Sequence, residues 1–321
     1  AEGARANLLQ AFEDKPTAYD AWEIEPTYKD RVHEFERVSG PSLVIAGPVR
    51  CVVRSKYAYK NSEITQDILL YSCKGVIDFR THVSWHEKNT LLKTAFPVDI
   101  RSSRASYETA FGIISRSTCS NTSWDQAQFE VSGHRFADLS ETDFGVSILN
   151  DCKYGWDIKG NLMRLSLLRS PVSPDPEADQ GEHDFTYSLF PHTDNSLSET
   201  IIAAHELNSP MLFEGGEAKE EAPDTCGWIA DVVTENAVID CVKEAEDDEN
   251  AFIIRLYEPR GARGETKVAF SRTVVSVCET DLLEEPVGGV NIEESDGADV
   301  ISFMLKPWEI RTFRVVFGGD E

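Results

Sequence analysis

The feature of this sequence that most constrains its fold is a hydrophobic period of two that recurs along nearly the whole chain. Apolar and polar residues alternate clearly in residues 75–86, and similar runs return about every ten residues with Gly, Pro and Asn between them. This alternation is typical of half-buried strands, whereas an amphipathic helix needs a period of 3.6. The pattern therefore predicts a mainly β protein built from sandwiches.

The expected strands share this alternation and a short length. In the first part of the chain they occupy residues 41–59, as two strands broken at Gly47-Pro48, then 64–72, 75–86, 91–100, 105–114, 127–133, 144–149, 161–168 and 184–192. Helical signals are few. Residues 4–14 are expected to form one short helix that closes before Pro16, and residues 198–208 are expected to form another.

The length of 321 residues predicts more than one domain. We expect residues 1–40 to be a linker and entry segment that precedes the first sandwich. Residues 41–212 should form a large β-sandwich, residues 213–224 an acidic linker, and residues 225–321 a smaller C-terminal β-domain. The chain begins without Met, so we expect a piece of a longer protein or a processed product.

The formal net charge of −25 sets limits on partners. Phosphate binding needs a basic surface, so we expect no nucleic acid partner and no binding to anionic membranes. The sequence also contains no apolar run of the roughly 18 residues that a membrane helix needs, and no apolar signal region at its start.

Cysteine usage predicts a reducing environment. The seven cysteines are widely spaced and form no CxxC pair; they are Cys51, Cys73, Cys119, Cys152, Cys226, Cys241 and Cys278. An odd number at wide spacing argues against a disulfide framework and against a zinc knuckle. We therefore expect a cytoplasmic location.

The stretch LNDCKYGWD, residues 149–157, places charged and aromatic side chains between two expected core strands. Asp151 and Lys153 stand two residues apart, and Tyr154 follows. A surface ion pair of little energetic value would explain them. A polar wall that hydrogen-bonds hydroxyl groups would explain them equally well, and the residues alone do not choose between the two.

Other candidate ligands carry weaker signals. His183, His192 and Asp194 have metal-binding side chains within twelve positions, but structural or surface histidines are the better interpretation. Most tryptophans of β-sandwiches belong to the core, although a few stack on sugars. Those weighed for this role are Trp22, Trp85, Trp124 and Trp156.

Long motifs in this chain resemble the C-terminal half of the α-mannosidases of glycoside hydrolase family 38, in their cytosolic and vacuolar branch. The motifs are FEDKPTAYDAWEI (12–24), FPVDIRSSRASYETAFG (96–112), NTSWDQAQFEVSGHRFADLSE (121–141), GVSILNDCKYGWDIKGNLMRLSLLRSP (145–171), DPEADQGEHDFTYSLFPH (175–192), VKEAEDDENAFIIRLYEP (242–259) and LKPWEIRTFRV (305–315). They occur in order and cover nearly the whole chain.

The resemblance implies a fold and a division of labour. The fold is a large sandwich similar to galactose mutarotase, followed by a smaller β-sandwich. Family members are retaining enzymes that remove terminal α-linked mannose with an Asp nucleophile and zinc. Both belong to an N-terminal catalytic domain, so we expect no catalytic residue, no metal ligand and no cofactor within this chain. The HTD at residues 192–194 lies in the wrong context to be the family's zinc motif.

The resemblance also gives LNDCKYGWD a role. In the family, one loop of the large sandwich closes a wall of the sugar pocket, and some branches carry an arginine there in a DR-x-x-G pattern. The equivalent place here reads NDCKYG, so the expected substrate-binding residues are Asn150, Asp151, Lys153 and Tyr154.

These inferences predict the non-catalytic C-terminal portion of an α-mannosidase. Its expected partners are its own catalytic domain, α-mannosides or oligosaccharides, and further copies of itself in a homo-oligomer. The alternatives are a stand-alone carbohydrate-binding β-sandwich and a self-sufficient glycosidase.

Overall fold

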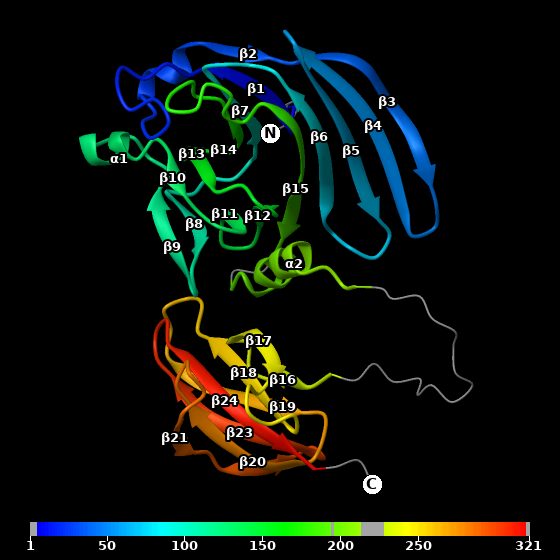
Figure 1. Cartoon of the computed structure of the whole chain (residues 1–321), viewed down its shortest axis with the longest axis vertical. Helices are drawn as coiled ribbons and strands as arrows, with labels where there is room; N and C mark the ends of the chain where they lie inside the picture. The colour runs from blue at the N-terminus through cyan, green and yellow to red at the C-terminus, as the bar shows by residue number, and fades with distance from the viewer. Residues whose placement is uncertain (1–4, 194–195, 213–227, 319–321) are drawn as a thin grey trace. The chain divides into compact units, whose positions relative to one another are not determined.

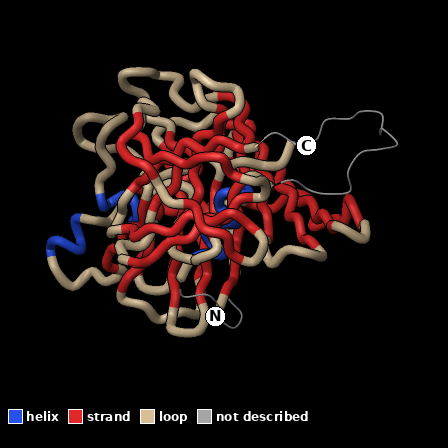
Figure 2. Tube along the Cα trace, turned by 90° about the horizontal axis from the view of Figure 1, so that it is seen from below, coloured by secondary structure: helices blue, strands red, loops and turns tan. Residues whose placement is uncertain are grey.

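A computed structural model describes residues 5–193, 196–212 and 228–318, and strands dominate this part of the chain (Figure 2). Contacts within the chain divide it into two compact units. The larger unit comprises Ala1–Glu108 and Ile114–Leu212, and the smaller unit comprises Thr109–Ile113 and Phe213–Glu321. The expected mainly β fold of two sandwiches is confirmed. The expected acidic linker, residues 213–224, lies outside the described residues.

The larger unit contains two antiparallel sheets (Figure 1). The six-stranded sheet has the order β10 (Val131–Ser132), β13 (Gly155–Lys159), β14 (Leu162–Arg169), β7 (Thr90–Pro97), β1 (Leu8–Glu13) and β2 (Val32–Glu34). The nine-stranded sheet has the order β3 (Glu36–Ala46), β4 (Arg50–Tyr59), β5 (Ser62–Tyr71), β6 (Ile77–Trp85), β15 (Gly181–His192), β12 (Gly145–Asn150), β11 (Phe136–Ser140), β8 (Arg104–Thr109) and β9 (Gly112–Ser117).

The core of this unit lies between the two sheets. Phe96 and Trp156 of the six-stranded sheet share one buried cluster with Phe79, Ile148 and Tyr187 of the nine-stranded sheet. The ring of Tyr187 stacks on Phe79 at 5.3 Å and meets Phe96 edge to face at 6.2 Å. Alternate residues of the strands supply these side chains, as the period of two requires.

The outer face of the six-stranded sheet is covered as well. Residues 14–31, which we call the strap, cross this face and include the short 3-10 helix η1 (Pro26–Asp30). Tyr28 packs there in a second apolar cluster with Phe12 and Leu91. Because β7 is covered on both faces, seven of its eight residues are buried and its alternation is lost.

The smaller unit is a second antiparallel sandwich. One sheet has the order β16 (Ala230–Val232), β19 (Gly264–Phe270), β23 (Ala298–Leu305) and β22 (Ile292–Ser295). The other has the order β17 (Val238–Glu244), β18 (Ala251–Tyr257), β24 (Ile310–Phe317), β20 (Val274–Thr280) and β21 (Pro286–Gly289). Its core joins Phe270 and Ile301 of the first sheet to Leu256 and Phe313 of the second.

The helix expected at residues 4–14 is wrong, because β1 occupies Leu8–Glu13. This strand pairs with β7 over six residues and with β2 on its other side. Helix propensity is a weak preference, and pairing inside a sheet outweighs it. Residues 8–13, which we placed in the leading linker, are thus a strand of the sandwich.

The second expected helix is confirmed as α2, Ser198–Asn208. A further helix, α1 (Ser123–Ala127), was missed, although Thr122 and Asp125 form a reciprocal capping box that signals it. The strand expected at 127–133 shrinks to Val131–Ser132.

Three other segments differ from expectation. The run 105–114 divides into β8 and β9, which are joined by a turn in which Phe111 has φ +55°. Strands β11 and β13 were not expected, and β13 lies within the segment that we interpreted as a connection. Within the described residues, no helix is both long and apolar enough to span a membrane.

Candidate functional site

The polar segment singled out in the sequence is a sharp crossing between the two sheets of the larger unit. β12 ends at Asn150 in the nine-stranded sheet, and β13 begins at Gly155 in the six-stranded sheet. Residues 151–154 therefore carry the chain from one layer to the other. Backbone groups that leave a sheet need new hydrogen-bond partners, so a packing reason for polar residues exists here beside any binding role.

Asn150 fixes this crossing. Its side chain is fully buried, and its Oδ1 accepts hydrogen bonds from the backbone N–H groups of Cys152 at 3.1 Å and Lys153 at 2.5 Å. Its Nδ2 donates to the carbonyl oxygen of His134 at 2.9 Å. An Asn side chain often holds a turn in this way. Asn150 is thus placed to shape the site from within the core.

Asp151 also serves the turn. Its Oδ2 accepts a hydrogen bond from the backbone N–H of Thr186 at 2.8 Å, and its own N–H donates to the Thr186 carbonyl at 3.2 Å. Its Oδ1 is buried and has no hydrogen-bond partner among the described residues. Burial raises the pKa of the Cys152 thiol to about 11, and the Asp151 carboxylate adds to that rise. The thiol therefore stays protonated at neutral pH.

Lys153 is half-buried, and Tyr154 is exposed. The Lys153 Nζ lies 4.6 Å from the ring centroid of Phe185, a cation–π distance. The ion pair that we weighed between Asp151 and Lys153 does not occur in the described part of the chain. The Tyr154 side chain is 53% exposed and meets the His134 ring edge to face at 5.5 Å.

The side chains of this crossing lie on different surfaces of the larger unit. Tyr154 lines a groove of about 360 Å³ on the outer face of the six-stranded sheet, together with Glu130 and Ser166. Asp151 lines a separate hollow of about 300 Å³, which α2 helps to enclose through Glu206. The four predicted residues are contiguous, but they do not converge on one pocket within this chain.

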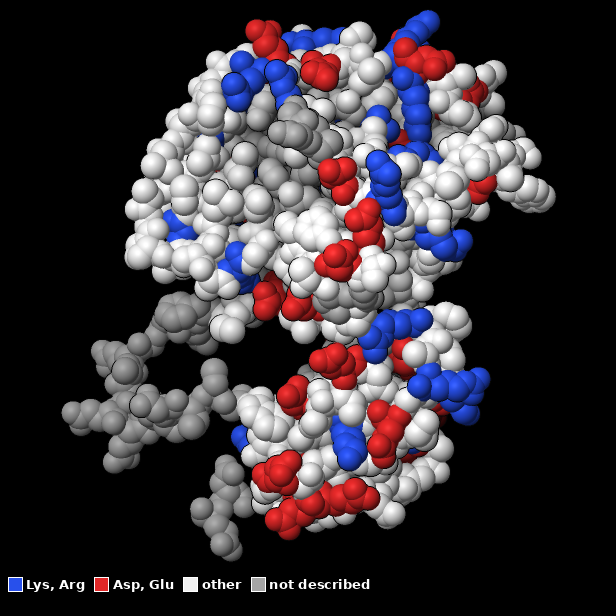
Figure 3. All heavy atoms as spheres, turned by 180° about the vertical axis from the view of Figure 1, so that it is seen from behind, with Lys and Arg blue, Asp and Glu red and all other residues white. Residues whose placement is uncertain are grey.

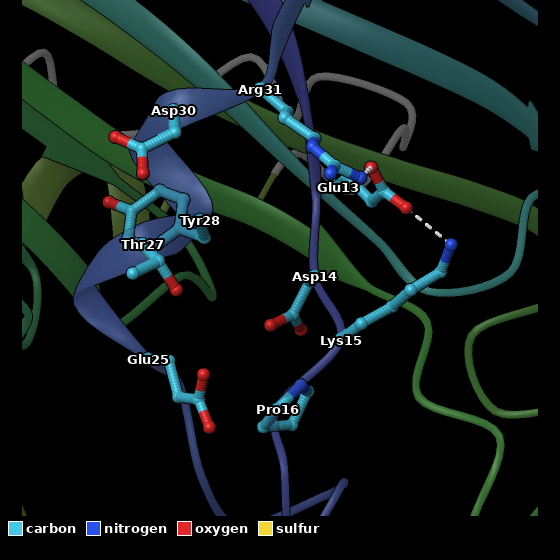
Figure 4. Close-up of a pocket in the computed structure, with 9 residues that line it drawn as sticks. All are labelled: Glu13, Asp14, Lys15, Pro16, Glu25, Thr27, Tyr28, Asp30 and Arg31. Carbon is cyan, nitrogen blue, oxygen red and sulfur yellow. Dashed lines mark hydrogen bonds and ion pairs between the residues drawn. The ribbon is translucent and has the colours of Figure 1, made fainter.

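A third hollow, of about 280 Å³, lies between the strap and β1 (Figure 4). Glu13 ion-pairs there with Arg31 at 2.6 Å and also contacts the Lys15 ammonium. The hydrogen bonds from Arg31 and then from Lys15 lower the pKa of Glu13 to about 2. Asp14, in the same wall, pairs with Arg169. Because these charges satisfy one another, we do not take this hollow as the functional site.

A buried charged cluster beneath the strap escaped the sequence reasoning. Lys93 of β7 is fully buried and contacts the carboxylate of Glu130. Its Nζ lies 5.0 Å from the ring centroid of Tyr28, whose hydroxyl donates to Glu130 Oε1 at 2.7 Å. Burial lowers the pKa of Lys93, against the opposing effect of the Asp157 carboxylate. A lysine inside the apolar run LLKTAF was the available signal.

Asp157 of β13 completes this cluster. Its Oδ2 lies 2.8 Å from the Lys29 Nζ of the strap and 3.0 Å from the Arg164 Nη1. Burial opposes ionisation, but the nearby cations of Lys93, Lys29 and Arg164 outweigh it, so the pKa of Asp157 lies below its ordinary value. These contacts tie the strap to the outer face of the sheet.

The histidines weighed as metal ligands are placed apart. His183 and His192 are nine positions apart in β15, so they face opposite sides of the strand. His192 is buried and lies 2.8 Å from Asp138 Oδ2, whereas His183 contacts the Asp179 carbonyl oxygen at 3.0 Å. Asp194 lies outside the described residues. In the described part of the chain, no three metal-binding side chains gather.

The tryptophans weighed for sugar stacking divide into two classes. Trp85 and Trp156 are fully buried core residues, as expected for most tryptophans of a sandwich. Trp22 on the strap and Trp124 on α1 are exposed, by 74% and 83%.

Acidic and basic side chains are interspersed on the face of the molecule that Figure 3 shows.

Fold and site together define an antiparallel two-sandwich protein with a polar crossing and a groove at one end of its larger unit. The family description "Glycosyl hydrolases family 38 C-terminal domain" matches residues 1–177, and "Glycosyl hydrolases family 38 C-terminal beta sandwich domain" matches residues 236–313. The chain belongs to glycoside hydrolase family 38, of which it is a C-terminal region.

Similar proteins have names that agree with this family. Alpha-mannosidase 2C1 of Mus musculus is 36% identical over 98% of this chain, and alpha-mannosidase G of Dictyostelium discoideum is 37% identical over 98%. The chain spans only 30% and 29% of the lengths of these two relatives. A family 38 protein from Enterococcus faecalis shares the fold with a TM-score of 0.73 at 15% identity, over 96% of this chain and 40% of that one.

Proposed function

We propose that this chain is the C-terminal portion of a retaining α-mannosidase, that it packs on a catalytic domain, and that residues 150–154 form one wall of the mannose pocket. The family membership and the names of the relatives support the reaction class. The relatives are about three times as long as this chain, which leaves room in them for a catalytic domain.

One observation supports the wall most strongly. The Lys153 ammonium rests on the Phe185 ring and has no carboxylate partner among the described residues, so its N–H donors are available to a ligand. The hydrogen bonds that Asn150 Oδ1 accepts from the backbone N–H groups of Cys152 and Lys153 fix the position from which this side chain extends. A rigid neighbour that orients the substrate lowers the barrier without taking part in bond cleavage.

We assign the chemistry of bond cleavage to the catalytic domain, outside residues 1–321. Retaining glycosidases use two carboxyl groups about 5 Å apart on either side of the scissile bond. Zinc, expected in the full-length enzyme, would hold sugar hydroxyls, and the described residues offer it no group of three ligands. The role of this chain is therefore to bind hydroxyls, to orient the sugar and to exclude water.

The test is Lys153→Ala in an enzyme that contains the catalytic domain. We expect kcat/KM for an α-mannoside to fall by about tenfold or more, because one charge-assisted hydrogen bond is lost. Lys74→Ala is a matched control, because Lys74 is also a surface lysine but pairs with Glu206 at 2.9 Å. Wild-type kinetics for Lys153→Ala would refute the wall.

A stand-alone carbohydrate-binding module is the second candidate. The exposed ring of Tyr154 beside an open groove favours it. Such a module would bind mannosides by itself and would not need the catalytic portion of a family 38 enzyme. Copurification of the chain with that portion, and restoration of hydrolysis on mixing, separate the two candidates.

A further inference from the structure

We infer that the groove beside Tyr154 is a saccharide-binding subsite that holds a neutral sugar next to the proposed mannose pocket. The inference rests on the proposed function for the identity of the sugar, a mannosyl residue. It concerns residues that the sequence did not single out, apart from Tyr154 itself.

The floor of the groove follows from strand register. Ser132 pairs with Gly155, Gly155 with Ser166, and Ser166 with Lys93, so the four residues form one row across the outer face of the six-stranded sheet. Directly opposed residues project on the same face. A Cβ at Gly155 would lie 2.9 Å from the Ser166 Cβ, so the row has no room for a larger residue beside that serine.

A β-bulge shapes the same floor. The register of β14 against β7 shifts between Ser166 and Leu168, which leaves Leu167 as the additional residue. Leu167 and Leu168 are both buried and both line the groove. Bulges occur beside binding sites, where they redirect side chains. Here Leu167 and Leu168 belong to the apolar core between the two sheets, and the bulge returns Arg169 to the outer face beside the groove.

Uncommitted hydrogen-bonding groups surround this floor. Within the described residues, no partner is found for Ser166 Oγ, which is buried, or for the exposed hydroxyl of Tyr154. Glu130 engages Tyr28 and Lys93 through Oε1, which leaves Oε2 for a ligand. The Asp179 Oδ2 accepts a hydrogen bond from the backbone N–H of Arg169 at 3.0 Å, which leaves the Asp179 Oδ1 for a ligand.

The charges select a neutral polyol. Two carboxylates at the rim, Glu130 and Asp179, disfavour an anion. The Arg169 guanidinium does not offset them, because it is engaged by Asp14 and by the strap carbonyls of Asp20 and Ala21. The buried Lys93 Nζ already contacts Glu130 from behind, so only one carboxylate oxygen of Glu130 remains for a ligand.

A saccharide meets all of these conditions. Its hydroxyls donate to carboxylates and accept from the Tyr154 hydroxyl, while its C–H face packs on apolar and aromatic groups. Glu130 is the central acceptor, and Lys93 and Tyr28 are positioning residues that hold its carboxylate in place.

The test titrates the chain, residues 1–321, with α-linked mannobiose and follows backbone amide signals by NMR. We expect saturable shifts at residues 130–132, 154–155 and 166–168, with a Kd of about 1–10 mM. Glu130→Gln and Tyr154→Ser should each weaken binding by about fivefold or more. Tyr154→Ser removes an exposed ring and should leave the unfolding temperature unchanged.

A control and a separate kinetic test complete the experiment. Glu206→Gln alters the hollow beneath α2 and should not change the Kd. The kinetics of Lys153→Ala in an enzyme with the catalytic domain test the pocket wall, and this titration tests the groove, which Lys153 does not line, so the two succeed or fail separately. Absence of saturation up to about 50 mM, or equal affinity in wild type, Glu130→Gln and Tyr154→Ser, would overturn the inference.

Discussion

At the scale of single residues, the polar crossing separates into positions whose side chains hold the backbone and positions whose side chains do not. Asn150 and one oxygen of Asp151 are engaged by main-chain N–H groups, whereas Lys153 and Tyr154 extend from the turn. All four look alike in the sequence as polar residues between core strands. A substitution at Asn150 would therefore disturb the turn itself, which is why Lys153 is the better probe of the pocket wall.

Gly261 provides a residue-scale prediction for the smaller unit. Its φ is +77°, and a Cβ there would lie 2.5 Å from the Trp308 ring. We expect Gly261→Ala to lower the free energy of unfolding of this unit by about 2–4 kcal/mol, from backbone strain together with the steric conflict.

Gly297→Ala is the matched control for this prediction. Gly297 has a φ of +79°, but a Cβ there would meet nothing within 4 Å. Gly297→Ala should lower the free energy of unfolding only by the backbone strain, about 1–2 kcal/mol. Urea unfolding monitored by tryptophan fluorescence measures both variants. An equal cost for the two would show that contact with Trp308 is irrelevant.

At the scale of elements, the strap and the outer face of the six-stranded sheet behave as one structure. Arg169 of β14 donates to the carbonyls of Asp20 and Ala21, and Lys29 and Tyr28 of η1 reach the buried charges of the sheet. The strap thereby fixes one rim of the groove.

The edge strand β3 is not covered in this way. All of its residues are exposed, and bulges interrupt its pairing with β4, which discourages edge-to-edge association.

Asp157 makes the link between strap and sheet dependent on pH. Its folded-state pKa lies below 3.8, so the ionised carboxylate stabilises the fold above that pH. This contribution is lost as pH falls through the folded-state pKa. We expect Asp157→Asn to reduce the free energy of unfolding by about 2–4 kcal/mol at pH 7, because it leaves buried cations without their partner.

The measurement is urea unfolding of wild type and Asp157→Asn between pH 7 and pH 2.5. The difference between them should shrink as pH falls toward the lowered folded-state pKa of Asp157, where the wild-type carboxyl becomes protonated. Asp184→Asn serves as control, because its side chain is 79% exposed and pairs with His82 at the surface. A difference that stays constant with pH would contradict the assigned role of the Asp157 charge.

At the scale of the whole molecule, the chain supplies two sandwiches and no group of three metal-binding side chains among its described residues. We expect residues 1–321 alone to show no hydrolysis of a chromogenic α-mannoside, with or without added zinc. An enzyme that also contains the catalytic portion should hydrolyse it. Hydrolysis by residues 1–321 alone, lost on chelation of zinc, would mean that the catalytic groups lie within this chain.

The sequence by itself determined the β period, the extent of helix α2 and the family, because these depend on local patterns and contiguous motifs. It also located the polar crossing at Asn150 to Tyr154. It could not place β1, whose conformation depends on pairing with residues about eighty positions away. Pairing across such distances leaves no local periodic signal.

Only the tertiary structure determined which residues meet to form the groove. Ser132, Gly155 and Ser166 come from three different strands, and strand register alone brings them into one row. The same register buries Lys93 beneath Glu130 and opens the surface beside Tyr154. A one-residue change of register would turn these side chains to the opposite face, so their meeting is a property of the packed sheet and not of any segment of the sequence.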